Sequence, residues 1–289
     1  MSDITNIKNV IQSTQKTKKI TRAMELVAAS KLGKTQAKMN EGRSYADSMN
    51  KMIRHVANSN SEYRHPFLQQ RGKGKNGYII ISSDRGLCGG LNNNLFRKIL
   101  LDLKSEQNIN ACLIGRKATQ FFKQLDLNIV AQADSLGDAP SVTQIVGIAQ
   151  NMIKAYNDGE INHVTLCYNR FINTMVQKPV SLQLLPIPAE KLESDTTTLN
   201  NSDCWDYIYE PEAKVVMDLL LERYIESQIY QAVIENIACE QAARMVAMKN
   251  ATDNAQKVID DMKLVFNKAR QASITQELSE IVSGAEAIN

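Results

Sequence analysis

The chain has 289 residues and a net charge of +3, a length that nominally suggests two domains. No window approaches 18 uncharged apolar residues, and the first residues lack a charged region followed by an apolar core, so the sequence predicts neither a membrane span nor an export signal. The cysteines are scattered, without a C-x-x-C pair or a neighbouring histidine pair, which excludes an obvious zinc site and favours a reducing compartment such as the cytoplasm. They lie at positions 88, 112, 167, 204 and 239.

Residues 1–60 are expected to form one helix, because the first proline is Pro66 and apolar residues recur at helical spacing. Three sets carry this spacing. The first is Ile4, Ile7 and Ile11, the second is Val10, Ile20, Met24 and Val27, and the third is the heptad series Leu32, Met39, Ala46, Met49, Ile53 and Val56. Narrow stripes of this kind are typical of a helix that packs against one partner helix.

The N-terminal arm is basic. Its first 56 residues carry eleven Lys and Arg against four Asp and Glu, an excess of +7 that leaves −4 for the remainder. This charge predicts an acidic partner surface, which could be nucleic acid, anionic lipid or protein. Tyr45 and Tyr63 are the only aromatic residues of the arm, so nucleic-acid stacking has little support. An acidic protein explains the charge at least as well, and a solvated helix face is the simplest alternative.

The middle of the chain alternates between strand and helix patterns, which predicts a mostly parallel sheet with helices on its faces. We expect strands at 77–82, 111–114, 128–133 and 163–168, with a further run around 174–186. We expect helices at 91–104, 116–125 and 141–157, the last entered through Ser141.

A glycine-rich loop, 83–92, follows the first expected strand. Loops of this kind can cradle phosphate groups. However, its G-x-x-G-G spacing matches neither dinucleotide nor P-loop motifs, so a structural loop with positive φ angles is the better interpretation. Cys88 has no local histidine partner and is a poor candidate nucleophile. No catalytic motif, metal site or cofactor site is evident, and the chain is not expected to be an enzyme by itself.

From Ala213 to Ser283 the sequence has no proline or glycine. A single helix over these residues would be roughly 107 Å long at 1.5 Å per residue. Apolar stripes recur along it at Ile229, Val233 and Ile237 and then at Val258, Met262, Val265, Ala269 and Ala272. A bundle of shorter helices is the alternative, but it would need breaks that this run does not offer.

Together these patterns predict an α/β protein in which a long two-helix coiled coil, whose arms could run antiparallel, joins a central Rossmann-like domain. The expected segments are the N-terminal helix at 1–60, the α/β domain with its flanking loops at 61–208, and the C-terminal helix at 209–289. A stand-alone nucleotide-binding protein that dimerises through its arms is one alternative function. A nucleic-acid-binding scaffold is another.

The chain resembles the γ subunit of bacterial F-type ATP synthases, the central rotor shaft. The most specific match is the C-terminal stretch 274–285, with Ile-Thr, a Glu two residues on, an acid three further, and then Gly-Ala. Further matches cover 19–31, 83–92 and 240–245. Because these motifs lie at both ends and in the middle, the resemblance covers the whole chain.

The resemblance implies a non-catalytic rotor subunit that couples rotation of the c ring, driven by protons, to conformational cycling of the catalytic β subunits. The expected partners are a ring of α and β subunits around the helix pair, the ε subunit, and the c-subunit ring. Nucleic acid is not among them. The implied location is the cytoplasmic face of the bacterial inner membrane, reached only through the complex.

Individual residues carry over where the motifs match. Met24, Arg244, Arg270, Gln271, Thr275 and Glu277 match contacts with β. Tyr207 and Glu210 match the part that meets the c ring. The cysteine-pair insertion of chloroplast relatives is not evident, so no thiol switch is expected.

Overall fold

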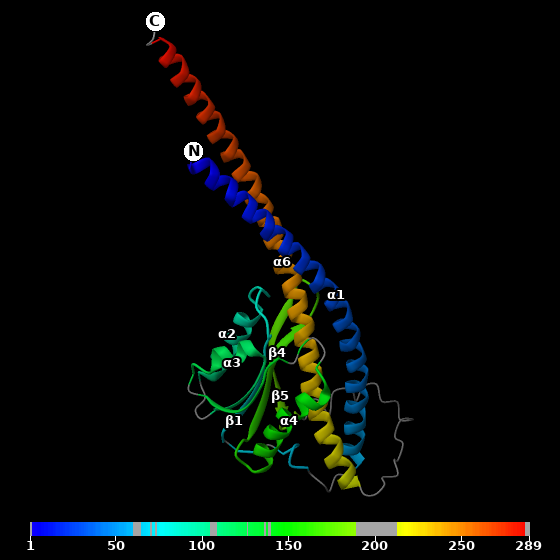
Figure 1. Ribbon diagram of the computed structural model, residues 1–289. Helices are drawn as coiled ribbons and strands as arrows, with labels where there is room; N and C mark the ends of the chain where they lie inside the picture. Colours follow the sequence, from blue (N-terminus) through cyan, green and yellow to red (C-terminus); the bar gives the residue numbers. More distant parts are fainter. Residues whose placement is uncertain are drawn as a thin grey trace. The chain divides into compact units, whose positions relative to one another are not determined.

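The computed structural model describes residues 2–59, 65–69, 71–72, 74–104, 109–125, 127–135, 137, 140–188 and 213–286 (Figure 1). Helices and strands alternate between two long terminal helices. In chain order the elements are α1 (Ser2–Ser59), β1 (Asn76–Ile81), α2 (Leu91–Leu103), β2 (Ile109–Ile114), α3 (Arg116–Phe122), β3 (Asn128–Ala133), α4 (Val142–Asn157), β4 (His163–Phe171), β5 (Gln177–Leu185) and α6 (Ala213–Glu286).

Both terminal helices are continuous. α6 runs through the whole expected stretch and includes Gly284, and α1 passes through Gly33 and Gly42 without a break. The long-helix interpretation is therefore confirmed over the bundle of shorter helices. The expected central elements are all present with shifted ends, and α3 ends at Phe122, earlier than 125. α4 begins after Ser141, whose backbone N–H donates to Oε1 of Gln144 at 3.1 Å, as in a capping box.

The sheet has five strands in the order β3-β2-β1-β4-β5. β1 lies at its centre and pairs in parallel with β2 on one side and β4 on the other. β2 and β3 are also parallel, whereas β5 forms an antiparallel hairpin with β4. The prediction of a mostly parallel sheet is confirmed.

The two faces of the sheet bury separate apolar clusters. Tyr78 and Ile80 of β1 face α2 and α3, while Ile79 and Ile81 face α4 and α6. In Figure 1, α2 and α3 lie on one side of the strands and the yellow-to-gold part of α6 lies on the other. Because both faces are covered, the β1 side chains from Gly77 to Ile81 are all buried, which explains its continuous apolar run.

The contacts divide the chain into two compact units. Unit 1 comprises residues 1–29 and 244–289, and unit 2 comprises residues 30–243. This division cuts through α1 and α6 rather than at their ends. The segment boundaries 1–60, 61–208 and 209–289 stay a prediction. Among the described helices, none combines the length and the apolar character that a bilayer crossing requires.

In unit 2, α1 and α6 pack directly against each other. Leu32, Met39, Met49 and Ile53 of the expected heptad series are buried, while the side chains of Ala46 and Val56 lie outside the described residues. Nε2 of Gln231 on α6 donates to the carbonyl of Met39 at 3.1 Å. Gly42 allows this approach, because a Cβ there would lie 2.1 Å from Oε1 of Gln231.

His65 supplies a pH-dependent contribution to the stability of this unit. The imidazole is buried, its Nδ1 accepts a hydrogen bond from the Phe67 N–H at 3.0 Å, and its Nε2 lies 3.2 Å from Oδ1 of Asp218. Burial lowers the pKa of His65 below its ordinary value of 6.5, although the nearby Asp218 acts in the opposite direction. The folded protein therefore holds this imidazole neutral at a pH where the unfolded chain is already protonated.

We predict that the free energy of unfolding falls as the pH drops below the unfolded pKa of 6.5, because the unfolded chain then binds the additional proton. Replacing His65 with Gln removes this part of the pH dependence. Denaturant unfolding at pH 7.5 and at 5.5, that is about one unit above and below that pKa, measures it. An equal loss of stability in wild-type and His65→Gln proteins would contradict the prediction.

Candidate partner-binding surfaces

In unit 1, α1 and α6 meet along a seam whose covered positions alternate in steps of three and four, the spacing of a two-stranded coiled coil. On α1 these positions are Ile4, Ile7, Ile11, Thr14, Lys18, Thr21, Glu25 and Ala28, with Met24 partly covered beside them. On α6 they are Met248, Thr252, Ala255, Ile259, Met262, Phe266, Ala269 and Ser273.

The centre of this seam is polar. The hydroxyls of Thr21 and Thr252 are 2.8 Å apart, and both residues are buried. One turn away, Nζ of Lys18 donates to Oε1 of Gln256. Because the higher-numbered α1 residue pairs with the lower-numbered α6 residue, the helices are antiparallel, as predicted. Two polar pairs in succession specify this register, since a shift along the seam would leave a hydroxyl or an ammonium group facing alkyl carbons.

Part of the sequence-based seam was wrong. Val10, Ile20 and Val27 were expected to form a stripe, but these side chains are 45%, 60% and 55% exposed. Threonine and lysine occupy the covered positions instead, so a search for apolar residues alone selected the neighbouring face. On α6 the same error assigned the exposed Val258, Val265 and Ala272 to the seam, while Met262 and Ala269 are partly covered as expected.

Met24 and Arg244, two of the expected β contacts, both belong to unit 1 but lie at different levels. The Thr21–Thr252 pair places Met24 about level with 249, so Arg244 is more than one turn of about 3.6 residues away. Met24 is partly covered and Arg244 is buried. Next to Met24, Arg22 forms an ion pair with Glu25 at 2.8 Å.

The remaining β-contact candidates lie near the C-terminal end of α6. Arg270, Gln271, Thr275 and Glu277 are all exposed. From 274 to 284 every described side chain of α6 is exposed, including Ile274, Leu278, Ile281 and Val282 at 49%, 58%, 68% and 57%. Four large apolar side chains on an exposed helix indicate a surface that another molecule covers. We refer to residues 274–284 as the α6 tip. Tyr207 and Glu210 lie outside the described residues.

The nucleotide-binding alternative requires an open crevice at the carboxyl ends of the parallel strands. Here α6 lies across this edge. Ile81, Ser82 and Gly115 face Val233, Asn236 and Glu240 around a cavity of about 20 Å³. Ligand pockets measure about 300–1,000 Å³, and the carboxylates of Asp84 and Glu240 on this wall would repel phosphate. On this face of the sheet the place of a dinucleotide is taken by a helix, while a cavity of about 370 Å³ lies on the other face, beside the glycine-rich loop.

The glycine-rich loop is a structural turn, as the sequence favoured. Gly89 and Leu87 have φ angles of 59° and 64°. Asn92 of α2 closes the loop, because its Nδ2 donates to Oγ of Ser83 at 2.7 Å and its Oδ1 accepts from the Ser83 N–H at 3.2 Å. Cys88 is buried and packs against Cys239 of α6, a location that suits packing rather than nucleophilic attack.

The thiols of Cys112 and Cys239, farther inside the fold, are chemically unreactive. Burial raises the pKa of Cys112 to about 12. Burial also raises the pKa of Cys239, and the Glu235 carboxylate adds to the shift. Thiolate is the reactive form, so both groups are inert near neutral pH. The expected lack of a thiol switch stays a prediction, since Cys204 lies outside the described residues. Among the described residues, no group of His, Cys, Asp and Glu is arranged to hold a metal ion.

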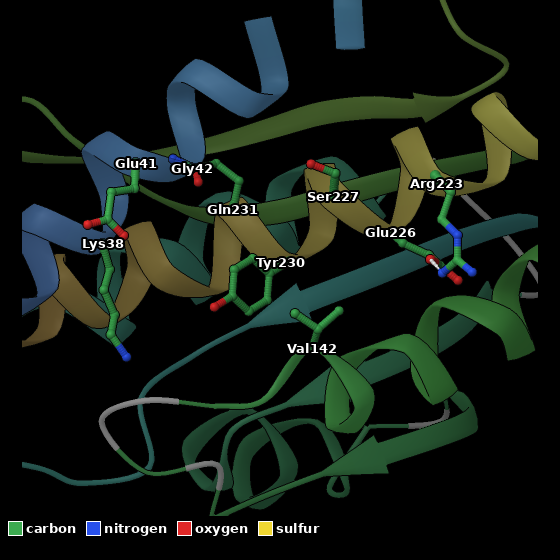
Figure 2. A pocket seen from close by; sticks show the side chains of 9 residues that line it. All are labelled: Lys38, Glu41, Gly42, Val142, Arg223, Glu226, Ser227, Tyr230 and Gln231. Carbon is green, nitrogen blue, oxygen red and sulfur yellow. Dashed lines mark hydrogen bonds and ion pairs between the residues drawn. The ribbon is translucent and has the colours of Figure 1, made fainter. Parts of the chain in front are cut away.

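A cavity of about 450 Å³ lies between α1, α4 and α6 in unit 2. Figure 2 shows that Tyr230 comes from α6 and Val142 from α4, with Lys38 and Glu41 contributed by α1. Arg223 and Glu226 pair with each other across 2.7 Å at its edge. With two cations and two carboxylates, the lining favours neither an anionic nor a cationic ligand.

The model of the ATP synthase family matches residues 3–288 of this chain. Similar solved structures come from mitochondrial ATP synthases. The chain is 24% identical to one in the central stalk and c-ring structure of Tetrahymena thermophila, with 80% of this chain and 99% of that chain covered and a TM-score of 0.60. It is 20% identical to one in the rotor structure of Euglena gracilis, with 94% and 99% covered and a TM-score of 0.63. These similarities show the same fold.

The threonine pair of the seam gives a testable prediction. In Thr21→Val or Thr252→Val alone, the remaining hydroxyl loses its threonine partner but still donates to the carbonyl of Met248 or Lys18. A loss of about 0.5–1.5 kcal/mol is therefore expected. The double variant replaces both hydroxyls with methyl groups, so it is expected to recover most of this loss. Thermal unfolding followed by helical circular dichroism, analysed as a double-mutant cycle, measures the coupling. Additive losses would show that the two hydroxyls do not interact.

Proposed function

The chain belongs to the ATP synthase family as its γ, central-stalk subunit, and we propose that it couples proton-driven rotation of the c ring to conformational cycling of the catalytic β subunits. The family's central-stalk subunit is not catalytic itself. On this proposal, the chain acts by making different contacts with each β subunit, so that differences in contact free energy select the conformation of each one.

The α6 tip is the observation that best supports a surrounding ring of subunits. Its apolar side chains, Ile274, Leu278, Ile281 and Val282, are about half exposed or more, and leaving such a stripe in water is unfavourable. We propose that the α and β subunits enclose this tip and that Arg270, Gln271, Thr275 and Glu277 contact β. The α6 tip carries polar side chains between its apolar ones, which suits a surface that must rotate against the α and β subunits around it.

The basic face of α1 supports an acidic partner. Lys16, Lys19 and Arg22 are exposed in unit 1, and the first 56 residues carry an excess of +7. We propose that acidic loops of the β subunits pass this face and contact Met24, and that Arg244 contacts β more than one helical turn away along α6. The field of a basic helix attracts such loops at every rotational position.

The remaining partners rest on the motif resemblance and on the names of the similar structures, which include a c ring. We propose that Tyr207 and Glu210 meet the c ring and that the α/β domain holds the ε subunit. The complex is membrane-associated, and we propose that this chain works on the cytoplasmic face of a bacterial inner membrane. The coiled-coil description of the α1–α6 pair belongs to the same proposal and is supported by its heptad seam.

Co-purification tests the assignment. The tagged chain, expressed in its own cells and isolated gently, is expected to carry α, β and ε subunits at fixed stoichiometry. A complex that contains the chain and hydrolyses ATP would agree with the proposal. Recovery of the chain without α and β subunits would overturn it.

Met24→Lys tests the proposed β contact. Placing a cation beside Arg22 in a surface that meets acidic loops is expected to lower the number of protons pumped per ATP by about threefold, a coupling change within the usual range. Assembly is expected to persist, since Met24 is only partly covered. Proton pumping and hydrolysis are measured on the same membranes. Met52→Lys, at a 51% exposed position of the same helix, is the matched control.

An unchanged pumping ratio in the Met24→Lys enzyme would contradict the proposed contact. An equal loss in both lysine variants would do so as well, because it would trace the defect to charge on α1 in general.

A further inference from the structure

β4 is longer than its central neighbour β1, so the end of β4 has no strand partner on the β1 side, although it still pairs with β5 on its other side. β1 pairs with β4 only up to Ile80 and Cys167, whereas β4 continues to Phe171. The strand residues that face β1 alternate along β4, and Asn169 and Phe171 are the next two on that side. The backbone groups of Asn169 and Phe171 therefore need other partners.

Side chains of α6 supply these partners. The Asn169 N–H donates to Oδ1 of Asn236 at 3.3 Å, and the Asn169 Nδ2 donates to the same oxygen at 3.0 Å. The thiol of Cys239 donates to the Asn169 carbonyl at 3.1 Å. Two residues along, the Phe171 N–H donates to Oε1 of Glu235 at 3.0 Å. A helix thus takes the place that a longer β1 strand would occupy.

The contacts of Asn169 are shielded from water, and the Phe171–Glu235 contact is partly buried. Asn169 and Asn236 are each 1% exposed, Cys239 is 0% exposed and Glu235 is 6% exposed. Water cannot replace a lost partner at such a site, so each donor that loses its acceptor bears its full desolvation cost. We call Asn169, Phe171, Glu235, Asn236 and Cys239 the β4–α6 latch.

The latch constrains α6 in a way that the surrounding apolar contacts do not. Ile229, Val233 and Ile237 also pack against the sheet, but methyl groups tolerate small slides because their attraction is not directional. In the latch, a shift of α6 by one residue would turn its side chains by about 100° and separate the acceptors from β4. Both the rotation of α6 and its position along β4 are therefore fixed at this point.

We propose that the β4–α6 latch is the point at which torque passes between α6 and the sheet of unit 2, with Glu235 and Asn236 as its positioning residues. The inference rests on the proposed rotor function, which requires torque on the helices to reach the domain that holds the c ring. A rotor whose helix slipped on the sheet would still bind its partners and still allow ATP hydrolysis. It would transmit less of the rotation.

Two substitutions at one position isolate the hydrogen bond from the charge. Glu235→Gln and Glu235→Met both remove the negative charge and have similar side-chain lengths, but only Gln keeps an oxygen that can accept from the Phe171 N–H. In the full chain, hydrogen exchange of the Phe171 amide is expected to be about tenfold faster in the Met variant than in the Gln variant, as one partly buried donor loses its partner.

The same pair is then assembled into the ATP synthase complex. We expect similar rates of ATP hydrolysis, but at least about a twofold lower number of protons pumped per ATP in the Met variant than in the Gln variant. Asn236→Leu, which removes the acceptor of Asn169, is expected to show the same loss. Ile99→Val, in the cluster on the other face of the sheet, is the control for general destabilisation and is expected to pump normally at a comparable fall in Tm.

Equal pumping ratios in the Gln and Met variants would overturn the latch as the point of torque transfer, and so would an equal loss in Ile99→Val. Either result would leave the rotor assignment intact, provided that the wild-type chain assembles and couples. If the wild-type chain did not assemble with α and β subunits, the proposed function itself would fail, whereas faster exchange in Glu235→Met would still support the contact between β4 and α6.

Discussion

Buried hydrogen bonds fix the position of α6 against β4 and against α1, and the other features of the structure depend on these bonds. An apolar interface between a helix and a strand, or between two helices, can shift at small cost because dispersion contacts are replaced by similar ones. A buried hydrogen bond cannot shift at small cost, because no water molecule can replace the partner of the displaced donor or acceptor. In unit 2 the bonds of Glu235 and Asn236 to β4 fix the helix on the sheet. In unit 1 the Thr21–Thr252 pair fixes the same helix on α1.

The unbroken course of α6 gives these contacts their significance. Its part in unit 2 packs against one face of the sheet and lies across the carboxyl ends of the parallel strands there. In unit 1 it forms a seam with α1, and its tip exposes an apolar stripe. A glycine or proline between these parts would decouple them, since either residue allows or forces a bend. A helix without such breaks, held by directional contacts, is suited to transmitting force along its length.

The architecture was largely predictable from the sequence, because long-range patterns determine it. The run from 213 to 283 without helix breakers, the alternation of elements and the apolar periodicity led to the long helices and the mostly parallel sheet.

The seam was predicted less well. Threonine at positions 21 and 252 was overlooked because an apolar search treats it as surface, although counting every residue in steps of three and four would have included it. The latch had a faint signal in Glu235 and Asn236, two polar residues inside an apolar stretch. They act as acceptors only because β4 extends beyond the end of β1. How far two strands overlap depends on both strands, so it cannot be read from the sequence of one strand alone. The positions at 207 and 210 lie outside the described residues and stay predictions.

Direct observation of rotation tests the account most closely. A visible probe would be attached to the exposed end of α2, at Lys104 in unit 2, in a complex whose α and β subunits are fixed to a surface. The probe is expected to turn in one direction while ATP is hydrolysed and to stop when ATP is removed. A probe that stayed fixed, or moved without direction, in a complex that hydrolyses ATP at the normal rate would contradict the claim that this chain is the rotor.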